Sequence, residues 1–488
     1  MSKQVFNPYL PSWEYIPDGE PKVFGDRLYI FGSHDRFDGD GYCENDYVAW
    51  STPVDDLSAW RYEGVILRKD QTPWNIKNEP YYAPDVVQGN DGRYYLYYFV
   101  ANSSIISVAV CDTPAGKYEY LGDVHMEDGH TYGSKPDEWF TFDPGVLVDD
   151  DKRIWLYTGS GQDSNGQYGH KIKGCFVLEL DQDMLTVISE PKVLLPANWT
   201  RKEPNFFEGA SIRHIGDWYY LVYPATDMTG LNYSMSKYPD REFVYKGRIH
   251  CTSDIGFEGR KLMGCAYPIG NNHGGLVCVN NQWYIFDHRM TNGSQWNRQG
   301  VAEPIQIKAD GTIDMVEATS CGLNNGPLKG QGSYPAYICC NLISKKVFGL
   351  RNPTGGPKVT QDGEDYVPEE PGNNEITGET ECNAPVSYIK DITKGCQIGY
   401  KFFDFTNTTS VSVETRNAKG KIQILDQLDG KVIAEEKLKE GADWTKTVIE
   451  FNPVMIFKGK KNVNLQKCPL FFRYHGTGSM EMLSFELN

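Results

Sequence analysis

One short pattern occurs five times in this chain, and it constrains the fold more than any other feature. Each copy starts with a single distinctive residue and then has Pro or Gly. A mostly apolar run follows, enters a tight polar turn and returns as a second run rich in aromatic residues. Two β-rich runs joined by such turns are typical of β-hairpins. The copies begin at Glu20, Ala83, Asp143, Glu208 and His273.

The spacing of the copies predicts their arrangement. They begin at residues 20, 83, 143, 208 and 273, so successive copies are 63, 60, 65 and 65 residues apart. A repeat of that length holds one hairpin and leaves room for two more strands, which is the size of a four-stranded propeller blade. Five copies therefore predict a five-bladed β-propeller. Radial symmetry gives equivalent positions the same surroundings, so we expect the five starting residues to ring one mouth of the central channel.

The rest of the chain has a different character. Beyond about residue 312 there is no further copy, only short alternating strands between Tyr334 and Leu487. A chain of 488 residues is long enough for two domains. We predict an all-β protein with a five-bladed β-propeller in residues 1–312 and a β-sandwich (jelly roll) in residues 313–488.

Composition limits the partners. The net charge of −17 argues against a nucleic-acid partner, which demands a basic face. No apolar stretch is long enough to span a membrane. Residues 1–12 lack the apolar core of a secretory signal, so we expect a cytoplasmic location unless a signal has been removed. The twelve cysteines show no metal-type spacing and are expected to be free thiols, as in a reducing compartment.

Three of the five ring positions carry a carboxylate, which suits glycoside hydrolysis. That reaction needs one carboxyl group to protonate the departing oxygen and another to activate water or attack the anomeric carbon. A third carboxylate raises its neighbour's pKa and so keeps the acid protonated. Glu208 as acid, Asp143 as modulator and Glu20 as base satisfy these needs, although spacing alone does not assign the roles. The alternative of solvated turn residues is weaker here, because each of the three precedes a strand.

Other residues near the predicted mouth can be interpreted in two ways. Trp74 and Tyr82 precede the second blade, and Phe142 precedes the third. Exposed aromatic rings there would offer platforms to a sugar face, whereas packing in the core is the alternative. His273 could act as a general acid or base, bind a hard cation together with water, or be a satisfied polar core residue. It has no Cys or carboxylate neighbours in sequence, which argues against zinc.

The ordered motifs resemble glycoside hydrolase family 43 over about residues 5–310. The matching residues are Glu20-Pro21, Ala83-Pro84-Asp85-Val86, Asp143-Pro144, Glu208-Gly209, Asn272-His273 and His288-Arg289. The resemblance implies a five-bladed propeller, inversion at the anomeric carbon, Glu208 as general acid and Asp143 as pKa modulator. Glu20 stands where the base lies, but the family usually has Asp before that first Pro. Asp18, two residues earlier, is the alternative base.

The same resemblance implies further binding residues. His273 matches a residue that binds a central calcium ion, often through water, and Arg289 matches an arginine that contacts the sugar. Residues 315–488 look like the carbohydrate-binding sandwich often attached to this family. Within it, Glu317 resembles a residue that helps to hold a structural calcium ion.

We therefore expect an exo-acting, inverting glycosidase that releases terminal xylose or arabinofuranose from xylan-derived oligosaccharides. A cytoplasmic location favours such short substrates, because polymers do not enter cells. An exo-galactanase or arabinanase on the same blades is the alternative enzyme, and a non-catalytic carbohydrate-binding propeller is the alternative outside enzymes. The preferred pentose and linkage, sugar binding by the sandwich and the oligomeric state are left open.

Overall fold

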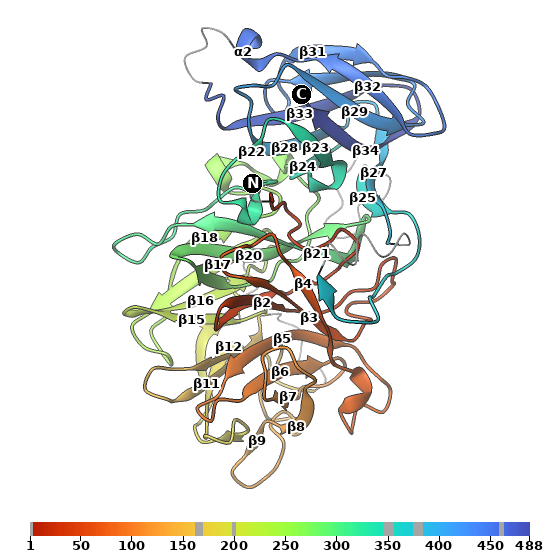
Figure 1. The fold of residues 1–488 in the computed structure, drawn as a ribbon. Coiled ribbons are helices and arrows are strands. Elements are labelled where there is room, and N and C mark those ends of the chain that lie inside the picture. The colour runs from red at the N-terminus through yellow and green to blue at the C-terminus, as the bar shows by residue number, and fades with distance from the viewer. Residues whose placement is uncertain (1–2, 162–168, 198–201, 345–355, 374–383, 458–462) are drawn as a thin grey trace.

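The structure is a computed structural model that describes residues 3–161, 169–197, 202–344, 356–373, 384–457 and 463–488. In these ranges the chain is built almost wholly of strands, with one four-residue helix, α2 (Pro453–Ile456). Five sheets form the larger body in the lower part of Figure 1, and two form the smaller body above it. The all-β prediction is confirmed. The described part of the chain also has five short 3-10 helices between strands: η1 (Lys69–Gln71), η2 (Phe257–Gly259), η3 (Leu262–Gly264), η4 (Gly322–Asn324) and η5 (Ala336–Ile338).

The first two sheets of the larger body are four-stranded blades. In both, consecutive strands pair antiparallel in chain order. Blade 1 comprises β1 (Glu20–Phe24), β2 (Arg27–Phe31), β3 (Tyr47–Pro53) and β4 (Arg61–Leu67), with β26 (Gly372–Asn373) added at its outer edge. Blade 2 comprises β5 (Tyr81–Gln88), β6 (Tyr94–Val100), β7 (Ile106–Cys111) and β8 (Glu119–Asp123).

The remaining three blades vary the same plan. Blade 3 comprises β10 (Gly145–Val148), β11 (Ile154–Ser160), β12 (Gly174–Leu180), β13 (Thr186–Val187), β14 (Lys192–Pro196) and β9 (His125–Met126). Blade 4 comprises β15 (Ser211–Ile215), β16 (Trp218–Pro224), β17 (Leu231–Ser236) and β18 (Val244–His250). Blade 5 comprises β19 (Leu276–Val279), β20 (Gln282–Thr291) and β21 (Ser294–Ile305).

The five repeated hairpins are the first two strands of the five blades, as the sequence predicts. Three of the turns contain a glycine with a positive φ, where other residues are strained: Gly25 (φ +62°), Gly92 (φ +87°) and Gly216 (φ +60°). The first strands lie innermost, and neighbouring ones contact each other around the axis. A parallel bridge between Gly19 and Gly274 joins the first blade to the last, so the ring is closed.

The N-terminal segment reinforces this closure. Its residue Asn7 exchanges hydrogen bonds with the backbone of Ala302 on β21, donating at 2.9 Å and accepting at 3.0 Å. Tyr9 packs against Phe286 of β20 and Trp60 of blade 1. Residues before the first blade thus lie across the last one.

The smaller body is a β-sandwich. One sheet contains β22 (Leu328–Lys329), β24 (Asn341–Ile343), β28 (Gln397–Asp404), β30 (Gly420–Leu425), β31 (Val432–Lys437) and β33 (Cys468–Gly476). The other contains β23 (Gly332–Pro335), β25 (Lys358–Gln361), β27 (Ser387–Thr393), β29 (Ser410–Arg416), β32 (Thr445–Glu450) and β34 (Ser479–Leu487). Both bury apolar side chains in one core, which includes Phe403, Phe472 and Phe485. A propeller followed by a sandwich is the predicted order.

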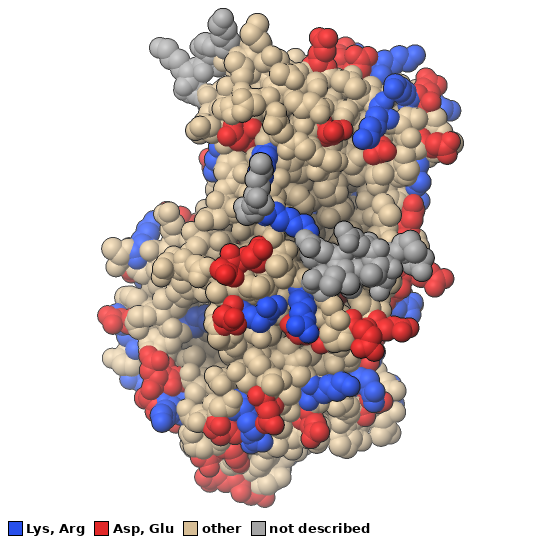
Figure 2. All heavy atoms as spheres, in the orientation of Figure 1, with Lys and Arg blue, Asp and Glu red and all other residues tan. Residues whose placement is uncertain are grey.

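The surface charges, the helices and the cysteines bear on the expectations drawn from composition. On the face shown in Figure 2, acidic and basic side chains of the described residues are interspersed. None of the helices in the described ranges is long and apolar enough to cross a membrane. The cysteines in these ranges are all free thiols, as predicted.

Candidate active site

A pocket of about 200 Å³ opens at the end of the propeller where the innermost strands begin. Three carboxyl groups share it, and aromatic, amide and guanidinium groups complete its wall. The lining residues are Asp18, Tyr42, Cys43, Tyr82, Phe142, Asp143, Phe207, Glu208, Met228, Asn271, Asn272 and Arg298. Side chains from all five blades or the segments that enter them therefore meet here, as blade symmetry predicts.

The backbone turns sharply where it delivers these carboxylates. Asp18 and Asp143 adopt left-handed conformations, with φ of +56° and +46°, and each lies two residues before the first strand of its blade. Gly209 (φ +62°) makes the equivalent turn directly after Glu208. A non-glycine residue in this region costs on the order of 1–3 kcal/mol, and such strain concentrates at functional sites.

Asp18 is held by an arginine. Arg298 donates from Nη1 to Oδ1 and Oδ2 of Asp18, at 3.2 and 3.3 Å. From Nε and Nη2 it donates to both oxygens of Asp35, at 2.9 and 2.8 Å. Burial opposes ionisation of Asp18, but Arg298, together with the other groups around the carboxylate, outweighs it and lowers the pKa of Asp18 to about 2. Asp18 is therefore a carboxylate at neutral pH, as a general base must be.

A histidine fixes the backbone of the same residue. His288 Nδ1 accepts a hydrogen bond from the Asp18 amide at 3.1 Å, and its Nε2 lies 3.3 Å from Asn271 Oδ1. The ring therefore accepts through one nitrogen and donates through the other, which is the neutral form. Burial, aided by the charge of Arg298, lowers the pKa of His288 to about 4, in agreement with that form.

Asp143 and Glu208 form the second part of the site. Asp143 is buried, while Glu208 is partly exposed on the pocket. Burial first, and then the nearby charges of Glu208 and Asp18, raise the pKa of Asp143 well above its usual range. Two close carboxyl groups titrate as a unit, so this pair retains a proton at pH values where an isolated carboxyl group is ionised. The pocket therefore holds an ionised carboxylate, Asp18, which can act as a base, and a protonated pair, Asp143 and Glu208, which can act as an acid.

The expected position of Glu20 at the mouth is wrong. Its side chain does not line the pocket; Oε2 is paired with Arg213 Nη2 at 2.7 Å and accepts from Ser211 Oγ at 3.1 Å. The reason is strand register. Glu20 is the first residue of β1, whereas Asp143 precedes β10 by two residues, so Asp18 is the counterpart of Asp143. The sequence signal for this residue was the acidic side chain itself, because Asp18 lies only two positions before Glu20.

Two predicted sugar-binding residues also lie elsewhere. Arg289 is buried and donates to the carbonyls of Cys339 and Tyr337 in the sandwich. It cannot reach the pocket, because side chains alternate along β20 and His288 faces that way. Trp74 is absent from the pocket lining; it donates from Nε1 to Asp123 Oδ1 at 3.1 Å, at the end of β8.

Tyr82 and Phe142 do lie on the pocket, where their rings are 6.3 Å apart. Their roles as sugar platforms stay a prediction. Sequence reasoning missed Tyr42, Phe207 and Arg298, which lie on the same wall. Tyr42 is on a loop and packs under the Arg298 guanidinium at 4.9 Å, and no local motif marks either residue.

The residues of the central channel next to Asp18 have the chemistry of a cation site. His273 is buried, with Nδ1 3.8 Å from Asp18 Oδ1 and Nε2 3.9 Å from Glu20 Oε1. Among the described residues none donates a hydrogen bond to the buried Glu20 Oε1. One unsatisfied carboxylate oxygen and an imidazole therefore fit a hard cation whose other ligands are water. The charges of Arg213 and Lys22, against the effect of burial, lower the pKa of Glu20, so this oxygen is ionised.

The predicted metal role of Glu317 does not fit the structure. Its Oε2 lies 3.0 Å from Lys401 Nζ, which also contacts Asp254 Oδ2 at 2.9 Å. An ammonium group there neutralises both carboxylates and repels a cation. This cluster instead joins the propeller to the sandwich.

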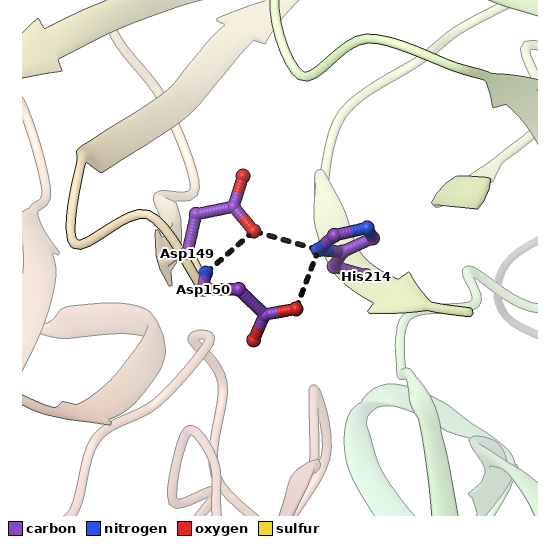
Figure 3. Close-up of side chains that lie close together, drawn as sticks. All are labelled: Asp149, Asp150 and His214. Atoms are coloured by element: carbon purple, nitrogen blue, oxygen red, sulfur yellow. Dashed lines mark hydrogen bonds and ion pairs between the residues drawn. The ribbon is translucent and has the colours of Figure 1, made fainter. Parts of the chain in front are cut away.

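Among the described residues, one further group of side chains has metal-ligand chemistry, and it lies at the hairpin turn of blade 3. His214 Nδ1 lies 2.6 Å from Asp149 Oδ1 and 3.6 Å from Asp150 Oδ2, and Figure 3 shows the three side chains pointing toward one another. Asp149 Oδ2 accepts from Tyr219 OH at 2.6 Å, and Tyr219 stacks on the histidine ring. Both oxygens of Asp149 are thus engaged, and the hydrogen bonds explain the cluster as a link between blades 3 and 4.

The fold and the carboxyl groups on its pocket define a class, the propeller glycoside hydrolases, and comparison with known proteins agrees. Residues 17–313 match glycosyl hydrolases family 43. The chain belongs to this family and is a glycoside hydrolase. It is 43% identical to a xylosidase/arabinosidase of Thermoclostridium stercorarium, over 100% of this chain and 99% of the relative.

Other relatives cover one or both domains. A xylosidase/arabinosidase of Bacteroides ovatus is 26% identical over 63% of this chain and 97% of its own length. A Xanthomonas citri enzyme of the family, solved with xylose, has a TM-score of 0.50 and 25% identity over 64% of this chain and 93% of its own. An arabinoxylan arabinofuranohydrolase of Bacillus subtilis covers 99% of this chain and 97% of its own, with a TM-score of 0.50. At 20% identity that last likeness shows only the shared two-domain fold.

Proposed function

We propose that the protein is an exo-acting, inverting glycosidase that releases terminal xylose or arabinofuranose from xylan-derived oligosaccharides. The observation that carries the proposal is the convergence of Asp18, Asp143 and Glu208 on one pocket. The substrate class is supported by the full-length relative, which is named a xylosidase/arabinosidase.

The roles follow from the environment of each carboxyl group. Glu208 gives its proton to the glycosidic oxygen as the bond between that oxygen and the anomeric carbon breaks. Asp18 accepts a proton from the water whose oxygen bonds to the anomeric carbon from the opposite face, so the configuration inverts. The negative charge that Asp143 can carry keeps a proton bound to the Asp143–Glu208 pair until Glu208 transfers it to the glycosidic oxygen. The base is therefore Asp18 rather than Glu20.

The shape of the pocket favours removal of one terminal sugar. At about 200 Å³ it is smaller than the sites of drug-sized ligands, which span roughly 300–1,000 Å³. Tyr82, Phe142 and Phe207 give the wall apolar faces for the C–H groups of a sugar ring, and Asn271 and Asn272 give it amide groups for hydroxyls.

We include a calcium ion in the proposal, held in the channel by His273 and the free oxygen of Glu20 through water. When bound, such an ion would add positive charge beneath the ionised base. Calcium should raise the melting temperature of chelator-treated protein, and Glu20→Gln should reduce that rise. An equal calcium effect in the wild type and the variant would contradict this assignment.

Hydrolysis of nitrophenyl xyloside and nitrophenyl arabinofuranoside tests the activity, with proton NMR of the first-formed anomer to test inversion. Oligosaccharides of arabinoxylan, arabinan and galactan test the linkage. Turnover restricted to arabinan or galactan would replace the proposed substrate class. Sugar binding without any turnover would support a non-catalytic propeller instead. We also retain the cytoplasmic location as a proposal, which cell fractionation would test.

A further inference from the structure

A segment of the second domain crosses back onto the propeller. Residues 358–373, here called the strap, begin in the sandwich as β25, paired with β27. They end as β26, which extends blade 1 by pairing with β4. Figure 1 shows this segment passing beside β3 and β4, on the side where β25 and β27 lie.

The strap contacts the loop between β2 and β3, residues 32–46. Asp365 makes the contact with both carboxylate oxygens. Its Oδ1 accepts from the backbone amide of Phe37 at 2.7 Å, and its Oδ2 accepts from Asn45 Nδ2 at 3.0 Å. Hydrogen bonds to an ionised acceptor are about twice as strong as neutral ones. A single strap residue therefore holds the loop at two points.

The held loop carries part of the pocket. Asn45 Nδ2 also donates to the carbonyl of Asp35 at 3.2 Å. The carboxylate of Asp35 binds Arg298 and accepts from the Cys43 amide at 3.1 Å. Arg298 in turn binds Asp18. Four contacts thus lead from the strap to the proposed base, and Tyr42 and Cys43 of the same loop line the pocket.

A second set of strap contacts reaches the other side of Arg298. The backbone amide of Asn292 donates to the backbone carbonyl of Val359 at 2.6 Å, and Thr360 Oγ1 donates to the side-chain oxygen Oδ1 of Asn292 at 2.9 Å. Asn292 Nδ2 donates to Asn297 Oδ1 at 2.9 Å, next to Arg298 in the chain. The strap therefore supports both neighbours of the guanidinium, the loop and the strand β21.

We propose that the strap is a positioning element of the pocket and that Asp365 is its main positioning residue, acting on Asp18 through Asn45, Asp35 and Arg298. The second domain then contributes to catalysis on any substrate, whether or not it binds sugar. The inference rests on the proposed function only in taking Asp18 as the base.

The test compares Asp365→Ala with Glu369→Ala, which removes an exposed carboxylate from the same strap. On nitrophenyl glycosides, too small to reach the sandwich, Asp365→Ala should lower kcat/KM about ten- to a hundredfold, as displacements near 1 Å do. Glu369→Ala should keep the wild-type value. Asp365→Asn keeps one acceptor oxygen for Phe37 and should be intermediate, and it replaces the alanine variant if that one fails to fold.

Amide hydrogen exchange gives a second result that needs no substrate. In Asp365→Ala the Cys43 amide, which donates to Asp35 Oδ1, should exchange at least several-fold faster than in the wild type. Unchanged kcat/KM together with unchanged exchange at Cys43 would overturn the proposal. Faster exchange at Cys43 in a protein without glycosidase activity would support the strap and contradict the proposed function, so the two failures are distinguishable. Loss of activity confined to long substrates would overturn positioning in favour of sugar recruitment.

Discussion

Arg298 Nη1 lies 3.2 Å from Asp18 Oδ1, while the other edge of the same guanidinium is held by both oxygens of Asp35. All three side chains are buried. One arginine from the last blade thus fixes a carboxylate that enters the first blade. This pairing keeps Asp18 ionised in a site where burial would otherwise favour its neutral form.

Replacing this arginine by lysine should damage activity more than stability. Lysine keeps the charge, but it cannot bind two carboxylates in the fixed fork geometry of a guanidinium. We expect Arg298→Lys to lower kcat on the order of a hundredfold, measured on a nitrophenyl glycoside, with the fold intact by circular dichroism. Wild-type kcat in a folded Arg298→Lys protein would show that Asp18 needs no such support.

Asp143→Asn should change the pH dependence of the reaction. The negative charge that Asp143 can carry favours retention of the proton on its pair with Glu208, and a neutral amide removes this effect. The proton needed for the leaving group is then lost at lower pH. We expect the alkaline limb of the kcat/KM profile to move down by about one pH unit or more. An alkaline limb that stays in place or moves up would contradict the role of Asp143 as modulator.

Arg289→Ala should weaken the contact between the domains and leave sugar binding unchanged. The substitution leaves the carbonyls of Cys339 and Tyr337 without their charged donor, and one such bond contributes about 1.5–3 kcal/mol. We expect a lower melting temperature with KM within about twofold of the wild type. Lys246→Ala, on the partly exposed β18, serves as a surface control. A tenfold rise in KM at an unchanged melting temperature would place Arg289 at the sugar after all.

The fold could be predicted because the hairpin repeat is a local signal. Each turn and each aromatic strand is visible in a few residues, and the count of copies gives the count of blades. The places of Asp143 and Glu208 could be predicted from the same repeat, because equivalent positions of the blades lie at the same end of the central channel, where both residues line the pocket.

The remaining site residues could not be placed from the repeat, for physical reasons. Asp18 and Glu20 differ by two residues, and only the observed start of β1 decides which one occupies the turn. Arg289 and His288 are adjacent but face opposite sides of β20. Arg298 lies beside Asp18 because the last blade closes against the first, which brings together residues far apart in the chain.

The central claim is that Asp18, rather than Glu20, activates water, and kcat/KM of Asp18→Asn beside Glu20→Gln on a nitrophenyl pentoside tests it most directly. Loss of a general base typically costs 10²–10⁴-fold. We predict a loss of at least about a thousandfold for Asp18→Asn at an unchanged fold. Glu20→Gln should lower the melting temperature, because it breaks a buried ion pair, and keep kcat/KM within about tenfold. The reverse pattern, an active Asp18→Asn and an inactive but folded Glu20→Gln, would contradict the account.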